Sequence, residues 1–594
     1  MNKNKKINVK RSIQGFVSFL APYKWGFIGA ILMGGVAVFT MTMAPTFEGR
    51  ITTSIANDVV NSPKGNIVID FENILRLIVI LLGIYLIKTI SQMFATIWLT
   101  NAIQHAMRDL RNAVLRKIRR LPVRYFDSHH VGDILSRITN DIDTVSIAMQ
   151  QSFINVVTGV LTLLFAIVMM FGIHAVMACI AFMIIPLSLL VTQTIVRYSQ
   201  KRFKAQQEAL GNLNGAITEM YGGYHEILLY NKQQESIEKF KELNDTLREN
   251  GFKAQFISSI IGPLNALVTY LTICVLAIYG TLKVLQGDLQ IGDLQAFIRY
   301  VWQVNDPLSQ ISALSSQIQA AAAAMTRIME VLDEEEEPAE KSLPLKVENV
   351  EEGVRFEHVA FGYGEENFIH DFNVDVKRGQ MVAIVGPTGA GKTTLINLLL
   401  RFYDVNKGRI TIDGVDIRDM KRGDLRDLFG MVLQDTWLFS GTIYDNIRYG
   451  RLDARKDEVI EAARMANVHH FIKTMPNGYD SYINEEANNI SQGEKQLLTI
   501  ARAILKNPEI LILDEATSSV DTRLEKMLQE AMKNVMKNRT SFVIAHRLST
   551  IRSADLILVI QNGDIVEQGT HDELMERKGA YEKLYNSQFA NASE

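Results

Sequence analysis

The sequence predicts an α-helical membrane domain of six transmembrane helices with long cytoplasmic extensions, followed by an α/β domain that contains a phosphate-binding loop. Two observations predict this class. Long apolar runs with few charges occur in the first half of the chain, and short β-branched runs that alternate with helical patterns and glycine turns begin near Val354. The whole-chain charged fraction of 21% therefore averages two unlike halves.

Length and composition exclude several classes of protein. A chain of 594 residues is too long for one ordinary core, so at least two domains are expected. Its 62 Lys and Arg residues balance 65 Asp and Glu residues, which argues against a polybasic nucleic-acid binder. Two cysteines exclude a disulfide scaffold or a cysteine-rich zinc module.

The first uncharged run, Trp25–Ala44, is long enough to cross a hydrocarbon core of about 30 Å. A sixth run, Leu294–Ile318, is more polar because it contains Arg299 and Asp306. We expect it to be a span whose charges line a cavity or its inner mouth, since an unpaired charge in lipid is costly; Asp306 in the wet inner leaflet is the alternative. The other predicted spans are Leu77–Leu99, Phe153–Ile173, Val176–Val196 and Phe256–Tyr279.

Basic residues predict the orientation of these spans in the lipid bilayer. The connections between the second and third runs and between the fourth and fifth runs are long and rich in Lys and Arg, whereas Pro45–Asn73 has only Arg50 and Lys64. Both basic connections and both termini are therefore expected in the cytoplasm, with the tips near Tyr125–Asp133 and Gly222–Tyr230 meeting a cytoplasmic domain. The Lys-rich start fits a bacterial cytoplasmic membrane protein.

The acidic run Asp333–Glu337 marks the predicted boundary between the two halves. We expect four parts: a cytoplasmic N-terminal segment over 1–24, a membrane domain over 25–332, an acidic linker over 333–348 and a nucleotide-binding domain over 349–594.

The second half contains a strand–loop–helix pattern typical of phosphate binding. The predicted strand Met381–Val385 leads into a sequence of the form G-x-x-x-x-G-K-T, followed by the helical Leu395–Leu400. Glycines at such a loop let backbone N–H groups wrap the phosphates of a nucleotide. A second apolar strand, Ile510–Leu513, delivers Asp514 for a water-mediated Mg²⁺ contact and Glu515 to polarise the attacking water. The loop residues that we expect to bind ATP are Gly386, Thr388, Gly389, Gly391, Lys392, Thr393 and Thr394, with Thr393 as an Mg²⁺ ligand.

The segment Ile490–Gln496 resembles the LSGGQ signature of ABC transporters. Six spans followed by this ATPase resemble a type IV ABC exporter half-transporter, which implies a helical subdomain, the cofactors ATP and Mg²⁺, and ATP hydrolysis between two nucleotide domains. The resemblance implies a role for each further landmark. Tyr363 stacks on adenine, Gln434 senses Mg²⁺ and the γ-phosphate, and His546 is the switch histidine. Ser518–Asp521 forms the D-loop with Asp521 at the nucleotide, and Ser491 and Gly493 contact the partner's nucleotide.

The signature departs from the family pattern at two positions. Gln492 replaces a glycine and Glu494 replaces a glutamine, which adds bulk and negative charge near a triphosphate. Both changes predict that the ATP site which this signature completes on the partner's P-loop is weakened. The chain's own P-loop, Glu515 and His546 are intact. We therefore expect one subunit of a heterodimer, as in bacterial heterodimeric multidrug exporters; a homodimer with a variant signature is the alternative.

The predicted function is ATP-driven export of amphipathic small molecules of the multidrug type, by alternating access. The sequence contains 23 methionines, which we expect to be lipid-facing or packing residues; a role in a drug pocket is the alternative, because adaptable thioether surfaces suit varied ligands. The alternatives are export of a lipid or a peptide and a nucleotide-gated channel or regulatory subunit.

Overall fold

The computed structural model describes residues 9–62, 68–341, 343–364, 366–433, 436–484, 489–514, 522–545 and 547–589. The chain divides into two compact units, each of which is described by itself. The helical unit comprises residues up to Arg120 together with His130–Glu334. The α/β unit comprises Leu121–His129 together with residues from Glu335 onward.

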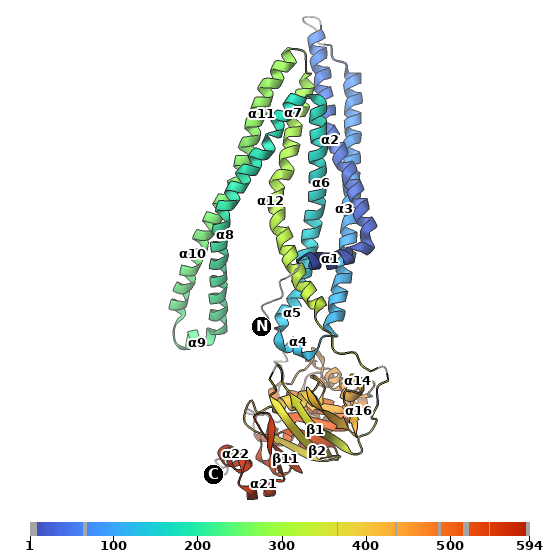
Figure 1. Ribbon diagram of the computed structural model, residues 1–594, viewed down its shortest axis with the longest axis vertical. Coiled ribbons are helices and arrows are strands. Elements are labelled where there is room, and N and C mark those ends of the chain that lie inside the picture. The colour runs from blue at the N-terminus through green and yellow to red at the C-terminus, as the bar shows by residue number, and fades with distance from the viewer. Residues whose placement is uncertain are drawn as a thin grey trace. The chain divides into compact units, whose positions relative to one another are not determined.

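Long helices make up the helical unit (Figure 1). Within the described residues, five helical stretches are long and apolar enough to cross a membrane, and they contain the first five predicted spans. The sixth predicted span lies in α12, which is helical as expected but is not among these five. The helices are α1 (Val9–Leu20), α2 (Lys24–Asn61), α3 (Phe71–Ile118), α5 (Val131–Ser136), α6 (Ile142–Ile173), α7 (Ala175–Phe182), α8 (Ile184–Gly222), α9 (Tyr224–Leu229), α10 (Gln233–Ser259), α11 (Ile261–Leu285) and α12 (Ile291–Asp333).

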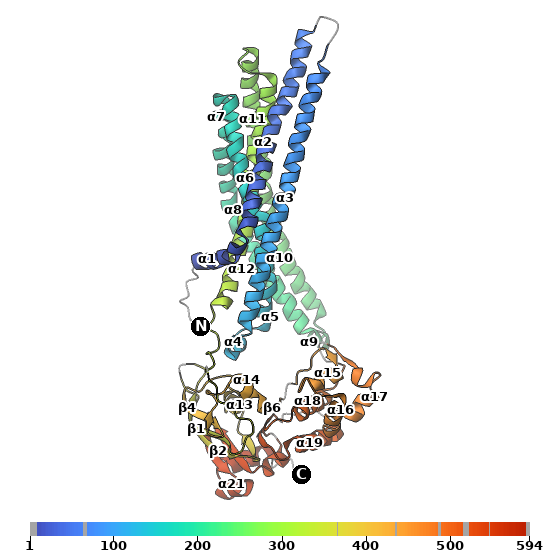
Figure 2. The same cartoon turned by 90° about the vertical axis from the view of Figure 1, so that its right-hand side faces the viewer.

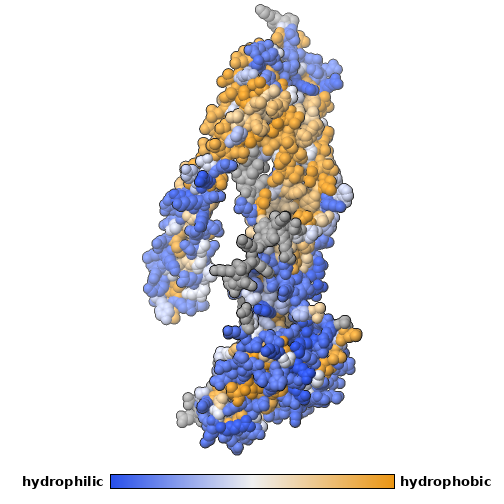
Figure 3. Space-filling view, viewed as in Figure 1, coloured by the Kyte–Doolittle hydropathy of each residue, from blue (hydrophilic) through white to orange (hydrophobic). Residues whose placement is uncertain are grey.

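The surface of the helical unit has an apolar region and a hydrophilic region. Apolar side chains cover much of the upper and middle part of the helices in this view, whereas the paired extensions of α8 and α10 are mostly hydrophilic (Figure 3). Leu82, Val168 and Leu190 are large apolar residues with more than half of their surface exposed. An apolar surface of this extent indicates contact with lipid, and the hydrophilic hairpin of α8, α9 and α10 indicates contact with water.

Two of the predicted spans contain a one-residue irregularity, although each lies within one long helical stretch. In the fourth span it is at Met183, between α7 and α8, and in the fifth it is at Ile260, between α10 and α11. Each irregularity lies three residues before a proline, Pro186 or Pro263. A proline lacks the N–H of a helical hydrogen bond and clashes with the preceding turn, so it is accommodated in the first turn of a new helix.

Helices α2 and α12 approach closely through glycine. A Cβ atom on Gly292 would lie 1.8 Å from the carbonyl oxygen of Gly49, so neither position has room for a side chain. The Gly292 N–H donates to Thr53 Oγ1 (3.1 Å), and Tyr300 Oη donates to the Thr42 carbonyl (2.8 Å). Small residues let transmembrane helices pack at short range, and these bonds fix the register of α12 on α2.

The α/β unit is built on a six-stranded sheet with the order β12-β11-β3-β10-β9-β6. Four of its five strand pairings are parallel, and β12 pairs antiparallel with β11 at one edge. Such strands are buried on both faces, which explains their apolar composition. The strands are β3 (Met381–Val385), β6 (Phe429–Val432), β9 (Ile510–Asp514), β10 (Thr540–Ile544), β11 (Leu556–Gln561) and β12 (Asp564–Gly569).

A second sheet and a helical group complete this unit (Figure 2). The sheet has the order β2-β1-β4-β5, with β1 (Gly353–Phe361), β2 (Ile369–Lys377), β4 (Lys407–Ile412) and β5 (Val415–Asp416). The helical subdomain confirms the predicted fold class and contains α15 (Ile443–Arg448), α16 (Lys456–Met465), α17 (His469–Thr474) and α18 (Gln492–Lys506). A two-stranded sheet of β7 (Gly441–Thr442) and β8 (Tyr482–Ile483) adjoins it in sequence. The remaining helices are α4 (Val123–Ser128), α13 (Lys392–Leu399), α14 (Arg422–Asp427), α19 (Thr522–Met536), α20 (Leu548–Arg552), α21 (His571–Arg577) and α22 (Ala580–Phe589).

Candidate nucleotide-binding site

The glycine-rich loop connects β3, near the middle of the six-stranded sheet, to the N-terminus of α13. Gly389 has φ +81° and Gly391, the residue before the helix, has φ +106°. These left-handed conformations are strained for residues with a Cβ atom, so glycine is required at both positions. The loop and the N-terminus of α13 together provide N–H groups suited to a phosphate.

A turn between β11 and β12 supports the loop from outside the motif. Gly563, which has φ +90°, donates its N–H to the Ala390 carbonyl (3.0 Å). The Phe368 ring packs against Gly391 of the loop, so closely that a Cβ atom on Gly391 would lie 2.7 Å from it. Sequence reasoning missed both residues, and the only sequence signal was the Asn562-Gly563 turn pair between two strands.

Lys392 lies over the loop. Its Nζ donates to the carbonyls of Gly386 (2.8 Å) and Pro387 (3.0 Å). Burial lowers the pKa of the Lys392 ammonium, and the charge of the nearby Asp514 opposes that shift. A half-buried cation beside these N–H groups suits the β- and γ-phosphates of a nucleotide.

Candidate Mg²⁺ ligands lie at the same edge of the sheet. Asp514 ends β9 and is in register with Ile544 of β10, the strand next to β3. The Thr393 side chain in the first turn of α13 is exposed, so its hydroxyl is accessible. Within the described part of the chain, no group of three His, Cys, Asp or Glu residues is placed to hold a metal.

Tyr363 presents an aromatic face beside the loop. Its hydroxyl donates to Thr394 Oγ1 (3.2 Å), and its ring packs edge-on against Phe361 and Tyr403 at centroid distances of 5.0 and 5.1 Å. The side chain is nevertheless 46% exposed. An anchored and accessible ring can stack on a nucleotide base.

Several predicted site residues lie outside the described residues. These are Gln434, Glu515, His546, Asp521 and the rest of Ser518–Asp521. Thr388 lies in the described loop, between Pro387 and Gly389.

Ser491 and Glu494 form a cap at the start of α18. The Ser491 N–H donates to Glu494 Oε2 (3.0 Å), the Ser491 hydroxyl donates to the same oxygen (2.7 Å), and the Glu494 N–H donates to Ser491 Oγ (3.4 Å). Gly493 is buried in the first turn. The Ser-x-x-Glu spacing that signals this capping box is visible in the sequence but was missed there. Glu494 therefore accepts a hydrogen bond from the Ser491 hydroxyl, the group that the sequence predicted would contact the partner's nucleotide.

Comparison with known proteins gives concordant results. Residues 27–308 match the family model described as ABC transporter transmembrane region, and residues 369–518 match the model described as ABC transporter. The fatty acid ABC transporter ATP-binding/permease protein of Mycobacterium bovis is 44% identical over 94% of this chain and 88% of its own. The chain belongs to the ABC transporter family.

The half-transporter also resembles other exporters. The ATP-dependent lipid A-core flippase of Syntrophus aciditrophicus is 34% identical over 85% of this chain and 84% of its own. A bacterial Atm1-family ABC exporter solved with ATP bound has a TM-score of 0.74 and 26% identity over 99% of this chain and 100% of its own. The protein is therefore an ABC exporter in which hydrolysis of ATP, with Mg²⁺, is coupled to transport.

Replacing Gly391 with alanine tests the loop geometry. The Gly391→Ala variant should bind Mg·ATP at least tenfold more weakly, because its backbone is left-handed and the new Cβ would overlap Phe368. The matched control is Gly364→Ala, where a Cβ meets nothing within 4 Å. Displacement of a fluorescent ATP analogue measures both affinities, and equal affinities would contradict the described loop conformation.

Proposed function

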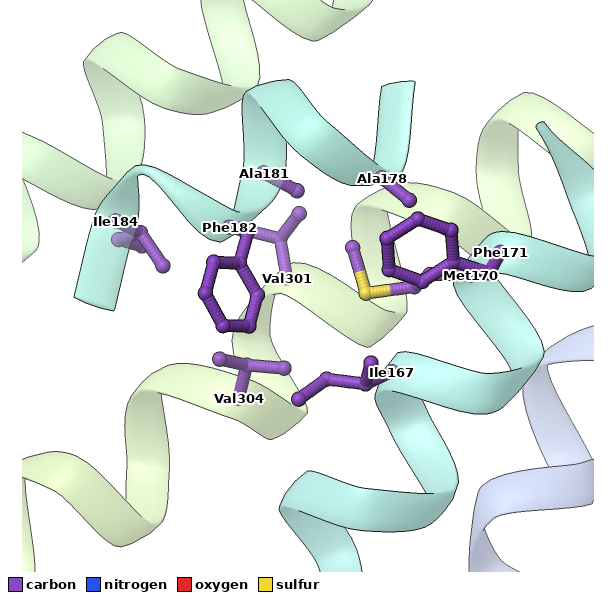
Figure 4. A pocket seen from close by; sticks show the side chains of 9 residues that line it. All are labelled: Ile167, Met170, Phe171, Ala178, Ala181, Phe182, Ile184, Val301 and Val304. Atoms are coloured by element: carbon purple, nitrogen blue, oxygen red, sulfur yellow. The ribbon is translucent and has the colours of Figure 1, made fainter. Parts of the chain in front are cut away.

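We propose that this half-transporter exports amphipathic molecules that carry a long apolar chain, such as fatty acids or other lipids. The observation that carries the proposal is an apolar pocket among α6, α7, α8 and α12 (Figure 4). Its lining has no charged or hydrogen-bonding side chain, so it presents an apolar surface of the kind that an acyl chain contacts. The lining residues are Ile167, Met170, Phe171, Ala178, Ala181, Phe182, Ile184, Val301 and Val304.

A polar group on neighbouring helices supports an anionic head group. Arg299 Nε lies 3.4 Å from Glu48 Oε2, and Tyr85 donates to Glu48 Oε1 (2.7 Å). The pair places Arg299 at a defined position while 63% of its side chain stays exposed. A positioned guanidinium can take a second carboxylate. Arg299 is thus proposed to contact the head group, and Asp306, also exposed on α12, to line the same path.

The proposed cycle begins with ATP at the glycine-rich loop. Lys392 and the loop N–H groups bind the phosphates, Tyr363 stacks on adenine, and Thr393, Asp514 and Gln434 hold Mg²⁺. Glu515 polarises the attacking water and His546 senses the γ-phosphate. ATP favours the closed arrangement of two nucleotide domains and so the outward-facing state, by its differential affinity.

The second nucleotide domain is proposed to come from a different half-transporter. Glu494 engages the Ser491 hydroxyl and adds a carboxylate where a partner's γ-phosphate would approach, so the site completed by this signature should be weak. A partner with a better signature and an impaired carboxylate would complement it. A homodimer that tolerates the variant is the second possibility.

The tip of the α8–α10 hairpin supports the presence of a partner chain. Tyr221 is 81% exposed and Leu229 is 75% exposed, and Tyr224 and Tyr230 are exposed beside them. Large apolar groups at a hydrophilic tip mark a contact surface, which we assign to the partner's nucleotide domain. The basic connections support an orientation with both termini in the cytoplasm of a bacterial cell.

Multidrug export is the second candidate function. It is favoured by the methionines of the membrane helices, of which Met170 lines the pocket and Met183 is exposed. A channel or regulatory subunit is less consistent with the sequence, which retains Glu515 and His546.

Replacing the Glu515 carboxylate tests both its role in ATP hydrolysis and the proposed heterodimer. In the complex with its partner, Glu515→Gln should lower ATP hydrolysis about 100-fold, because the attacking water loses its base. Glu509→Gln, which changes a carboxylate before β9, should leave the rate unchanged. The chain purified alone should hydrolyse ATP only weakly. Strong hydrolysis by the lone chain that Glu515→Gln abolishes would contradict the heterodimer.

Filling the pocket tests the substrate class. In nanodiscs, palmitate should stimulate ATP hydrolysis, and Ala181→Leu should raise the half-maximal palmitate concentration about tenfold by displacing about two methylene groups of the acyl chain. Val176→Leu is the control on the same helix, because Val176 is 51% exposed and outside the pocket. Unchanged stimulation in Ala181→Leu, with equal responses to a cationic dye, would favour multidrug export instead.

A further inference from the structure

Tyr403 links the nucleotide site to α4 inside the α/β unit. Its ring lies 5.1 Å from the Tyr363 ring and 5.6 Å from the Phe361 ring, in edge-on contacts. Its hydroxyl donates to a carboxylate oxygen of Asp127 on α4. The helix α4 belongs to the tip that the sequence predicted would meet a cytoplasmic domain, and Leu121–His129 clusters with the α/β unit. One side chain therefore contacts both the proposed adenine platform and a connection between membrane helices.

The loop that carries Tyr403 directly follows α13 and is held by several contacts. Arg401 is buried and donates to Asp404 (2.9 Å) and to the carbonyls of Ile417 and Met420 (3.1 Å each). The Arg426 guanidinium lies 5.1 Å from the Phe402 ring. This loop directly follows α13, whose first residue is Lys392. A change at the phosphates can thus reach Tyr403 through α13, and a change at adenine can reach it through Tyr363.

Helix α4, which carries Asp127, is held by contacts among its neighbouring residues. Tyr125 is buried and stacks on His129 at a centroid distance of 4.3 Å. The Ser128 hydroxyl donates to the Tyr125 carbonyl (3.0 Å), and His129 Nδ1 lies 2.9 Å from the same oxygen. The two ends of the Tyr403–Asp127 bond therefore belong to anchored segments, so the bond can transmit a displacement.

We propose that Tyr403 is a positioning residue that transmits nucleotide occupancy to α4 through its hydrogen bond to Asp127. The inference rests on the proposed ATP site and goes beyond it, because it assigns a route on the adenine side of the nucleotide. A bound adenine fixes Tyr363, Tyr363 fixes the Tyr403 ring, and the hydroxyl then holds α4 in one place.

The electrostatic surroundings of the Tyr403 hydroxyl keep it protonated, so that it can donate a hydrogen bond. Burial and the Asp127 carboxylate raise the pKa of the Tyr403 hydroxyl, and Arg124 opposes the shift. The hydroxyl therefore stays protonated at physiological pH and donates to a charged acceptor, which makes a stronger bond than a neutral one.

Hydrogen exchange of the full chain with its partner in nanodiscs tests this route, with Mg·AMP-PNP as the probe. In the wild type, the nucleotide should slow exchange about tenfold both at the glycine-rich loop and at residues 121–129. Tyr403→Phe and Asp127→Ala each remove the bond, so protection at 121–129 should be lost while protection of the loop remains. Because one bond is removed, the double variant should match either single variant.

Tyr479→Phe is the matched control. Its hydroxyl bonds to His469 in the helical subdomain (2.8 Å), away from α4, so it should behave as the wild type. Full protection of 121–129 in Tyr403→Phe would overturn the inference, as would a wild type protected only at the loop. A wild type without protection at the loop would instead overturn the proposed ATP site.

Discussion

The chemistry of this protein depends on the backbone of the glycine-rich loop. Gly389 and Gly391 must be left-handed so that N–H groups converge on a phosphate, and this conformation is supported by β3, by Phe368 and by the Gly563 turn. Lys392 is fixed by the same loop carbonyls. Because α13 starts at Lys392 and is followed by Tyr403, the proposed route to α4 begins at the same loop.

In the membrane helices, the corresponding constraint is the cost of polar groups in lipid. Arg299 is paired with Glu48, Tyr85 satisfies the other carboxylate oxygen, and Tyr300 donates to a backbone carbonyl of α2. These contacts let α12 carry charge next to an apolar pocket. A head-group contact and an acyl-chain contact can therefore coexist on a few helices.

Sequence reasoning predicted features that depend on local pattern. Apolar runs gave the spans and the G-x-x-x-x-G-K-T motif gave the loop, because each is encoded by neighbouring residues. The one-residue irregularities at Met183 and Ile260, each three residues before a proline, were not predicted. Tyr403 and Asp127 could not have been paired from sequence, since they are 276 positions apart and no motif joins them.

The central claim is that ATP hydrolysis moves an acyl-chain amphiphile outward. The most direct measurement is uptake of radiolabelled palmitate into inside-out membrane vesicles that contain the full complex. We expect accumulation with Mg·ATP and none with Mg·AMP-PNP or with Glu515→Gln. Palmitate that equilibrates equally under all three conditions, while ATP is hydrolysed, would contradict the account.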